Sequence, residues 1–500
     1  MKYFLVVIFT FSFVIYSQES KSVHQRDKYK FGSIEYLSEL QSYNKEDIIP
    51  LIKSKSTLSR TIFGFLPYWE YQTSKNYLHY ELLTHIVVFD FEADSLGNLS
   101  NPLRWPWTEV INAAHSNNVK IIMCVTCFDR DRIRSIISNL KIKTIFFENV
   151  LKIVRDFNLD GVNIDFESLY SADEGTPINN FMKDLSEFMH SNINNTEISI
   201  DVPPINWSSH WNLSDLSNSC DYIFIMGYDY NGDWSETTGP SSPLTGDVYN
   251  LSYSLTNTKI GFGEIVDSHP EKLILGIPYF GNEWIARSGN AGDSVISFLG
   301  SNRYRDNVTN VIPFGRLWNS SYQVPWFRWQ TNETWHQVWY DDEESIGLKY
   351  DLAVSKNLKG TGIWALGYDG SRQELWNVIK QKFTEIVSVN QEFQTNTFIL
   401  YQNYPNPFNE STKIKYSVPS LRTSLMKFVQ LKIYDILGNE IAALVNENKP
   451  AGTYEVEFST GSFENGLELP SGIYIYRLEI FSDILQNNSF VETRKMILLK

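Results

Sequence analysis

The sequence predicts an α/β protein in which a (β/α)8 barrel precedes a smaller, all-β sandwich. Eight short runs of β-branched and aromatic residues alternate with helical patterns between residues 61 and 384. Most of these runs are continuously apolar, as expected for parallel strands buried on both faces. After residue 398 the pattern changes to segments of alternating hydrophobicity with turns about every ten residues, which is typical of an immunoglobulin-like antiparallel sandwich.

The eight runs predict the strands of the barrel. In chain order they are residues 61–69, 85–91, 120–128, 161–167, 197–203, 221–228, 272–281 and 362–368. Amphipathic helical patterns lie at residues 107–116, 142–157, 178–193, 343–357 and 372–383. Eight strand–helix units over about 320 residues fit a closed barrel. A doubly wound open sheet is the alternative, but no Gly-rich phosphate turn follows the first run.

A long insertion, residues 282–342, separates the seventh run from its helix. It is rich in large aromatic residues: Trp284, Tyr304, Trp318, Tyr322, Trp326, Trp329, Trp335, Trp339 and Tyr340. Such a cluster suits either stacking on a neutral sugar or the insertion's own core, and the sequence leaves both open.

The N-terminus predicts a secretory signal peptide over residues 1–17. Lys2 is followed by about fifteen mostly apolar residues and then by the small Ser17. The stretch is short for a membrane span, which needs roughly 20 apolar residues. A membrane anchor remains the alternative, because Ile15 is large for its place before the cleavage position. Residues 18–60 are polar and weakly patterned, and they predict a leader region with room for one short helix.

We therefore expect a leader at residues 18–60, a barrel at 61–384, a polar linker at 385–398 and a second domain at 399–500. The formal net charge is −15, from 43 Lys and Arg against 58 Asp and Glu. A phosphate backbone needs a basic surface, so no nucleic-acid partner is expected. The three cysteines cannot form a disulfide framework. Cys124 and Cys127 lie three apart on one strand with no clustered His, which predicts core cysteines, no metal site and no cofactor.

The fourth run, residues 160–167, carries the chemistry. On a strand, Asn163, Asp165 and Glu167 share one face, while the apolar residues between them share the other. In a barrel this polar face ends at the carboxyl edge, where barrel active sites are built. Two carboxylates about 7 Å apart repel each other, which raises the pKa of one and suits it to donate a proton. A solvated strand face is the alternative, but the flanking apolar residues argue against it.

This run resembles the Asp-x-x-Asp-x-Asp-x-Glu signature of glycoside hydrolase family 18, the chitinases and endo-N-acetylglucosaminidases. Asn163 stands in place of the second Asp. Residues 226–229 resemble the family's Met-x-Tyr-Asp motif, and residues 275–281 are typical of its seventh strand. Trp364 in the eighth run resembles the Trp that forms the floor of the sugar site. Together these motifs span residues 61–384 in the family's order, which implies a TIM barrel.

The resemblance implies substrate-assisted retention, in which the substrate's acetamido group attacks its own anomeric carbon. Glu167 would be the general acid and then the base that activates water. Asp165 would orient the acetamido nitrogen and stabilise the cationic oxazolinium intermediate. Tyr228 would donate to the acetamido oxygen, and Asp229 would bind nearby hydroxyl groups. Trp364 would offer an apolar plate to the sugar, and for both Trp364 and Tyr228 ordinary core packing is the alternative.

The remaining expected site residues follow from their positions beside these motifs. Met226, Tyr68 and Trp69 are expected to contact substrate, although core packing fits Tyr68 and Trp69 equally well. In the family the second Asp can share a proton with the third. Asn163 can only offer a hydrogen bond to Asp165, so we expect Asp165 to stay ionised and the pKa of Glu167 to be less elevated.

Residues 401–409, 433–440, 470–474 and 495–500 resemble the type A sorting domain of the type IX secretion system. This implies the secretion machinery as a partner, export through the periplasm, and a secreted or surface-attached product. A carbohydrate-binding sandwich is the alternative for this segment.

The combined expectation is a secreted hydrolase that cleaves β-1,4 linkages of glycans containing N-acetylglucosamine. Chitin, peptidoglycan glycan and the core of N-glycans all supply the acetamido group, so the substrate stays open. A lectin-like protein of the same fold is the alternative, and the presence of Glu167 favours the enzyme.

Overall fold

The computed structural model describes residues 21–32, 47–54, 57–246, 249–384, 399–418, 426–450, 452–460, 469–481 and 490–499. The chain divides into two compact units, Met1–Glu385 and Ile386–Lys500, and each has its own hydrophobic core. The predicted signal peptide and linker lie outside the described residues.

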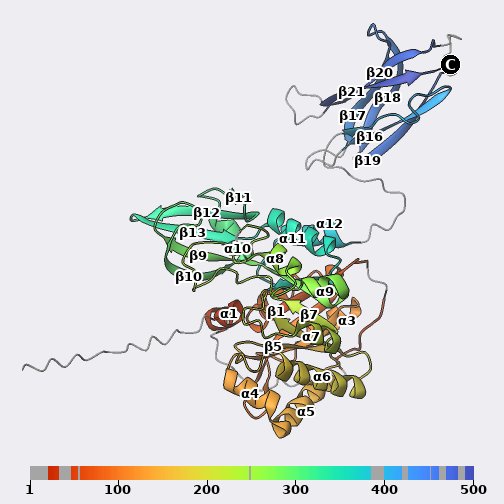
Figure 1. The fold of residues 1–500 in the computed structure, drawn as a ribbon. Coiled ribbons are helices and arrows are strands. Elements are labelled where there is room, and N and C mark those ends of the chain that lie inside the picture. Colours follow the sequence, from red (N-terminus) through yellow and green to blue (C-terminus); the bar gives the residue numbers. More distant parts are fainter. Residues whose placement is uncertain are drawn as a thin grey trace, which may run out of the picture. The chain divides into compact units, whose positions relative to one another are not determined.

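Eight parallel strands form a closed barrel in the first unit (Figure 1). They are β1 (Thr61–Pro67), β2 (His85–Ala93), β4 (Lys120–Cys127), β5 (Gly161–Phe166), β6 (Glu197–Val202), β7 (Tyr222–Ile225), β8 (Leu273–Pro278) and β14 (Gly360–Trp364). Each strand pairs with the next in this order, and β14 returns to β1. Every predicted run overlaps one of these strands. The predicted TIM barrel is confirmed, and the closure excludes an open sheet.

The helices of this unit lie mainly in the connections between barrel strands. They are α2 (Tyr68–Ser74), α3 (Thr108–Ser116), α4 (Arg130–Ser138), α5 (Leu140–Asp156), α6 (Thr176–Asn192), α7 (Leu213–Ser219), α8 (Leu251–Thr256), α9 (Gly263–Ser268), α11 (Glu343–Ser355) and α12 (Glu374–Phe383). The two-residue strand β3 (Leu99–Ser100) pairs antiparallel with β2. Local sequence fixes several helix starts: Asn139 accepts hydrogen bonds from the first N–H groups of α5, and Asp342 forms a capping box with Ser345 at α11.

Aromatic rings fill the interior of the barrel below its polar mouth. The ring of Phe224 lies 4.9 Å from that of Phe65 and 5.9 Å from that of Phe63, between centroids. Gly362 makes room for Phe224, because a Cβ atom at this position would lie 2.1 Å from its ring. The packed floor leaves the carboxyl ends of the strands as the place for polar side chains.

The insertion after β8 forms an antiparallel sheet. Its strands β9 (Phe280–Ala286), β10 (Val295–Arg303), β11 (Leu317–Asn319), β12 (Val324–Thr331) and β13 (Thr334–Tyr340) lie in the order β10-β9-β13-β12-β11, with α10 (Tyr304–Asn310) after β10. Trp284, Trp326 and Trp339 are buried together, and the last two stack at 5.0 Å. Of the two roles that the sequence left open, these three residues take the second, because they form a core of the insertion.

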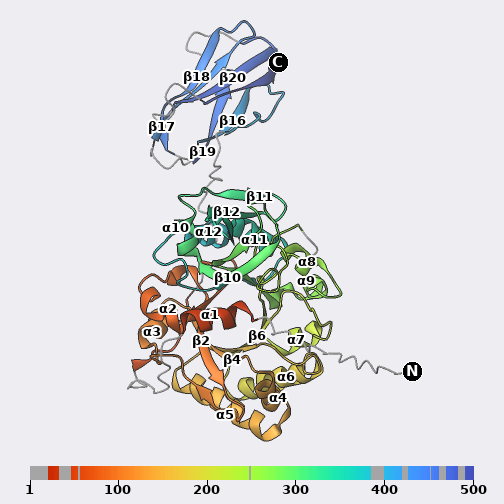
Figure 2. The same cartoon turned by 90° about the vertical axis from the view of Figure 1, so that its left-hand side faces the viewer.

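Helix α1 (Val23–Phe31) precedes the barrel in sequence and lies between the barrel strands and β10 (Figure 2). Ser22 caps it by accepting a hydrogen bond from the N–H of Gln25 at 3.2 Å. The helix has no apolar stripe, since its buried residues are Val23, His24 and Asp27. A nine-residue polar helix is marginal in water by itself, so its contacts with the barrel must hold it.

The second unit is a two-sheet sandwich. One sheet has the order β15 (Ile399–Leu400), β16 (Ser411–Val418), β19 (Gly452–Ser459), and the other β18 (Glu440–Pro450), β17 (Met426–Tyr434), β20 (Gly472–Phe481), β21 (Phe490–Leu498). All their pairings are antiparallel. Inward residues such as Ile414, Leu431 and Leu478 are buried between the sheets, which confirms the predicted all-β architecture.

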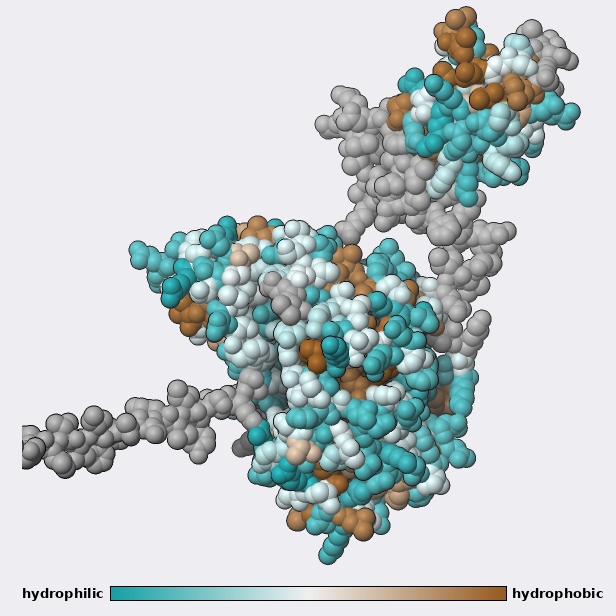
Figure 3. Space-filling view, viewed as in Figure 1, coloured by the Kyte–Doolittle hydropathy of each residue, from teal (hydrophilic) through white to brown (hydrophobic). Residues whose placement is uncertain are grey.

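The face shown in Figure 3 is largely hydrophilic, with scattered apolar residues. Among the residues that the structure describes, none of the helices combines the length and the apolar character needed to cross a membrane.

Candidate active site

Strand β5 carries the first part of the site. Asn163 and Asp165 are fully buried on its inward face. Glu167 follows the strand, its N–H donates to the carbonyl of Cys127 at 3.1 Å, and its side chain is 9% exposed. The predicted polar row therefore ends at the carboxyl edge of the barrel.

Asn163 does not bond to Asp165 as expected. Its Nδ2 donates to Asp201 Oδ1 at 2.7 Å and to Ser199 Oγ at 3.1 Å. Both amide hydrogens are used in this way, so none is left for Asp165. The expectation failed because the nearest polar partners lie on the neighbouring strand β6, not along β5.

Asp201 is a buried carboxylate that the sequence reading missed. Burial, followed by the nearby charge of Asp165, raises its pKa well above the usual range. The signal was available: Ser199 and Asp201 lie two apart within the fifth apolar run and share a face, as Asn163 and Asp165 do in the fourth.

The loop after β7 supplies three expected residues. The Tyr228 hydroxyl lies in the site, and its side chain is 1% exposed. Burial, followed by the charges of Asp201 and Asp165, raises the pKa of Tyr228 well above its usual range, so it remains a hydrogen-bond donor. Asp229 accepts a hydrogen bond from Arg26, and Met226 lines the adjoining cavity.

Trp364 ends strand β14 and is fully buried at the floor of the mouth. Trp69 lies at its edge, with ring centroids 6.5 Å apart, and donates weakly to Tyr368 at 3.4 Å. Tyr68 donates to the carbonyl of Gly32 at 3.0 Å. Tyr68 and Trp69 belong to helix α2 and not to the end of the first strand.

His24 of helix α1 occupies the centre of the site. Its Nδ1 lies 2.9 Å from Asp165 Oδ2 and 3.1 Å from Glu167 Oε1, and its Nε2 lies 2.9 Å from the Tyr228 hydroxyl. Its ring stacks on Trp364, with centroids 3.7 Å apart and planes at 28°. Burial would lower the pKa of His24, but the charges and hydrogen bonds of Asp165 and Glu167 outweigh it and raise that pKa well above the usual range.

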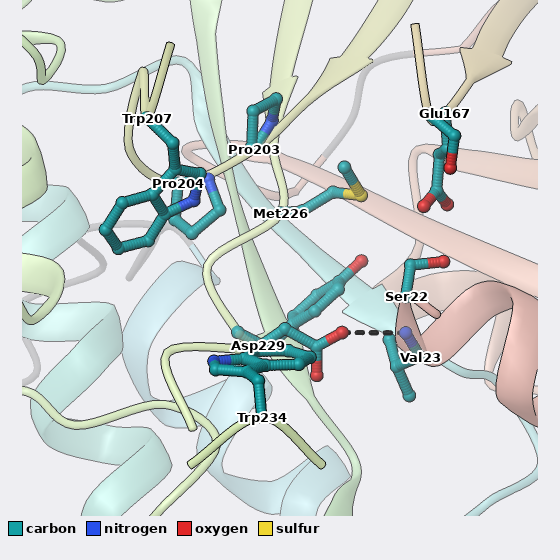
Figure 4. Close-up of a pocket in the computed structure, with 11 residues that line it drawn as sticks. Ser22, Val23, Glu167, Pro203, Pro204, Trp207, Met226, Asp229 and Trp234 are labelled. Carbon is teal, nitrogen blue, oxygen red and sulfur yellow. Dashed lines mark hydrogen bonds between the residues drawn. The ribbon is translucent and has the colours of Figure 1, made fainter. Parts of the chain in front are cut away.

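Other groups of α1 take up the remaining site residues. The N–H of Val23 donates to Asp229 Oδ2 at 2.7 Å (Figure 4), and Arg26 donates to Asp229 Oδ1 at 2.7 Å. Asp27 accepts from Trp364 Nε1 at 3.0 Å and from Tyr368 at 2.8 Å. Because the leader is polar and weakly patterned, sequence reasoning missed these contacts. The Ser22 cap before a short basic run was the one local signal of a helix.

The carboxyl groups are arranged to keep one proton. Burial, followed by the charge of Asp165, raises the pKa of Glu167 above its usual value, although contacts with His24 and Ser22 act in the other direction. This is the direction that a general acid near neutral pH requires.

A cavity of about 520 Å³ adjoins these residues. Figure 4 shows Glu167, Met226 and Asp229 around it, with Trp207 and Trp234 on the loops beyond. The two Trp residues are 53% and 44% exposed, respectively. Their rings offer flat apolar surfaces in the cavity that Glu167 also lines, outside the place that His24 fills.

No residue is assigned to a metal. Within the described part of the chain, ligand atoms of His24, Asp165 and Asp201 lie within 4.8 Å of one another. Both His24 nitrogens already contact protein oxygens, so the ring has no free lone pair for an ion. Cys124 and Cys127 are free and buried on β4, and burial raises the pKa of both thiols.

Two family models match parts of the chain. Residues 61–369 match the family model described as glycosyl hydrolases family 18, and residues 402–497 match the secretion system C-terminal sorting domain. Human di-N-acetylchitobiase is 23% identical over 316 residues, which are 56% of this chain and 77% of the relative.

Two solved structures share the fold. A chitinase from Cycas revoluta in complex with (GlcNAc)3 gives a TM-score of 0.56 at 18% identity, over 64% of this chain and 99% of that one. The Bacillus cereus spore cortex-lytic enzyme gives 0.50 at 19% identity, over 65% and 75%.

Proposed function

The chain belongs to the glycosyl hydrolases of family 18, and we propose that it cleaves β-1,4 linkages of glycans containing N-acetylglucosamine by a retaining, substrate-assisted mechanism. One observation carries the proposal. Side-chain oxygens of Asp165, Glu167 and Tyr228 all lie within about 3 Å of the His24 ring, which stacks on Trp364. The site is thus built to hold a ring bearing N–H groups between two carboxylates and a phenol.

In the proposed reaction a sugar takes this place. Tyr228 donates to the acetamido oxygen, and Asp165 accepts from the acetamido N–H. The acetamido oxygen bonds to the anomeric carbon as the glycosidic C–O bond breaks, and Glu167 gives its proton to the leaving oxygen. Asp165 then balances the charge of the oxazolinium. Water attacks the anomeric carbon, its proton passes to Glu167, and the acetamido group is restored.

The cavity beside Glu167 suits the leaving part of the substrate. It begins at the acid and continues toward Trp207 and Trp234, whose exposed rings can stack on sugar faces. Asp229 is placed to bind hydroxyl groups. The substrate class is chitin or peptidoglycan glycan, since relatives include a chitobiase and a protein described as a cortical fragment-lytic enzyme.

The enzyme assignment is tested by turnover of a chromogenic N-acetylglucosamine oligomer. Glu167→Gln is introduced both into the full chain and into its His24→Ala variant, and each product is compared with its own parent. The second background is needed because His24 fills the site. We expect Glu167→Gln to lower turnover at least about 100-fold. The matched control is Glu187→Gln, the same change at a position 68% exposed on α6. Binding without turnover in the His24→Ala background would favour the lectin alternative, and equal rates with and without Glu167 would reject its role.

The C-terminal unit carries the export proposal. A secretion sorting domain directs its chain to the cell surface or the extracellular space, and we propose passage through the periplasm, followed by release or surface attachment. Removal of residues 399–500, which contain their own core, should leave the barrel unit inside the cell envelope. Unchanged amounts of enzyme in the medium would reject a sorting role.

A further inference from the structure

We propose that residues 22–32 are an inhibitor in cis, so that the chain is latent while helix α1 lies in the site. This rests on the proposed function, because it identifies the site that α1 closes. Five expected substrate-binding or catalytic groups contact α1: Asp165, Glu167, Tyr228, Asp229 and Trp364. A sugar cannot reach Trp364 while the His24 ring stacks on it at 3.7 Å.

Basic residues of α1 on the same helix as His24 pair with acidic residues of the site. Arg26 pairs with Asp229, and Lys28 pairs with Asp90 at 2.6 Å and Glu92 at 2.9 Å. Lys30 donates to the carbonyl of Ser301 in the insertion. The helix thus presents a cation to acidic residues of the mouth at two places besides His24.

The same helix also anchors itself on the floor of the site. Asp27 is fully buried and takes hydrogen bonds from Trp364 and Tyr368, and Arg303 of β10 lies 3.8 Å over the ring of Phe31. At the end of the helix the carbonyl of Gly32 accepts from Tyr68. The sugar-site aromatic residues therefore bind α1 at both its polar and its apolar groups.

A permanent structural role for α1 fits these contacts less well. A helix that belongs to a barrel core contributes an apolar stripe, whereas α1 buries His24 and Asp27 and contributes one apolar core residue, Val23. The His24 nitrogens and Asp27 Oδ2 bond to residues of the site, whereas Asp27 Oδ1 is buried without a partner. Its removal would take Val23 and the flanking Phe31 from the edge of the core and would expose the polar site to solvent.

The decisive experiment measures turnover and oligosaccharide affinity of the full chain, of His24→Ala and of His24→Ala with Asp27→Ala. We expect the double variant to exceed the parent at least 100-fold in kcat/KM. The matched control on the same helix is Tyr29→Ala, because Tyr29 is 80% exposed, and it should behave as the parent does. Equal kcat/KM in the parent and the double variant would overturn the proposal. Tight binding by the double variant without turnover would instead reject the proposed enzyme function and leave the inhibitor in place.

Two further measurements test competition for the site directly, and the second uses the parent chain alone. A peptide of residues 20–32 should inhibit the double variant competitively, while the same peptide with His24→Ala should be at least tenfold weaker. In the parent, saturating N-acetylglucosamine oligomer should speed amide hydrogen exchange in residues 23–31 at least tenfold. Binding of the oligomer with unchanged exchange would show that α1 and substrate do not compete, and would overturn the proposal.

A second inference concerns Asp201, and a different observation carries it. We infer that Asp201 is a positioning residue that shares a proton with Asp165. Asp201 on β6 takes this role because residue 163, where the family has an Asp, is Asn. The carboxyl oxygens of Asp165 and Asp201 lie within 4.8 Å. Asn163 holds Asp201 Oδ1 at 2.7 Å. The other oxygens, Asp165 Oδ1 and Asp201 Oδ2, are both buried without a hydrogen-bond partner, so either can carry the one proton that two neighbouring buried carboxyl groups retain.

The test is the pH dependence of kcat in the unblocked His24→Ala background. The ionisable groups that face Asp201 are Cys124, Asp165, Glu167 and Tyr228, with His24 on α1 in the parent. Replacing Asp201 by Asn removes a negative charge near Glu167 at high pH, which lowers the pKa of Glu167. The alkaline limb of the kcat–pH profile should therefore move to a pH lower by about half a unit or more. Adding Asn163→Asp to Asp201→Asn should move it back. An unchanged profile in Asp201→Asn would overturn the inference, and a loss of rate without a shift would assign a merely structural role.

Discussion

Raising the pH should release helix α1 from the site. The pKa of His24 is raised above its usual value near 6.5 by Asp165 and Glu167, against the effect of burial. Docking of the charged ring is therefore fully favoured below about pH 6.5 and is lost as the pH rises through the raised value. The groups that face the ring are Asp165 and Glu167 from β5, Asp201 from β6, Tyr228 after β7, and Arg26 and Asp27 on its own helix.

The size of the effect follows from the contacts. The protonated ring makes two contacts to carboxylates, at 2.9 and 3.1 Å. Both contacts are made by Nδ1, so the neutral ring can keep them, but it loses the charge assistance in each, while its Nε2 accepts from Tyr228. A charge-assisted hydrogen bond contributes about 1.5–3 kcal/mol and a neutral one about 0.5–1.5 kcal/mol. Deprotonation should therefore weaken docking by about 2 kcal/mol, roughly 30-fold in the docking constant.

The assay is the ratio of kcat/KM for His24→Ala to that of the parent, measured from pH 5 to pH 10. Both proteins carry Glu167, so most of the loss of general acid at high pH cancels in the ratio. We expect the ratio to fall by about 30-fold across the alkaline range. A ratio that is constant or that rises with pH would refute the argument that charge on His24 holds the helix.

Three further outcomes are expected. Trp364→Ala should lower the affinity of the unblocked site for oligomers at least tenfold, measured by calorimetry, because the sugar loses its plate. Trp207→Ala and Trp234→Ala should raise KM for long oligomers several-fold and leave the midpoint of thermal unfolding nearly unchanged, because both rings are exposed. Lys349→Met should lower the free energy of unfolding by about 3–5 kcal/mol in urea, because Asp341 then remains buried without its ion-pair partner; a loss below 1 kcal/mol would contradict this.

The barrel could be predicted because the same sequence pattern, a short apolar run, occurs once for each of its strands. Each of its strands is buried on both faces, so each leaves a short apolar run in the sequence. The inward polar row on β5 was visible for the same reason, since Asn163, Asp165 and Glu167 interrupt such a run at every second position. Strand ends were less sharp: Tyr68 and Trp69 continue the first apolar run but belong to α2, because an apolar run alone does not mark where a strand becomes a helix.

The contacts between strands could not be read in the same way. Asn163 bonds across to β6, and this depends on the register that pairs Asn163 with Ser199. The insertion shows a related limit. Trp284 and Trp339 are the residue type that a sugar-stacking surface uses, yet they lie on paired strands of one sheet and are buried together in a core. A count of aromatic residues cannot tell an exposed ring from a buried one.

The sequence predicted room for one short helix in the leader, and α1 lies there, but its place in the site escaped prediction because contacts with the barrel stabilise it. It has neither an apolar stripe nor a charge pattern that would hold a helix in water, and most of its partners lie more than 60 residues away along the chain, up to Tyr368. Those partners include the groups that would stabilise the planar, cationic oxazolinium in the proposed mechanism: two carboxylates, a phenol and an aromatic ring. An imidazolium ring binds the same groups as the oxazolinium, because both are planar, positively charged and carry N–H donors. The features that would make the site catalytic would therefore also make it a receptor for His24, and a change that weakens one function should weaken the other.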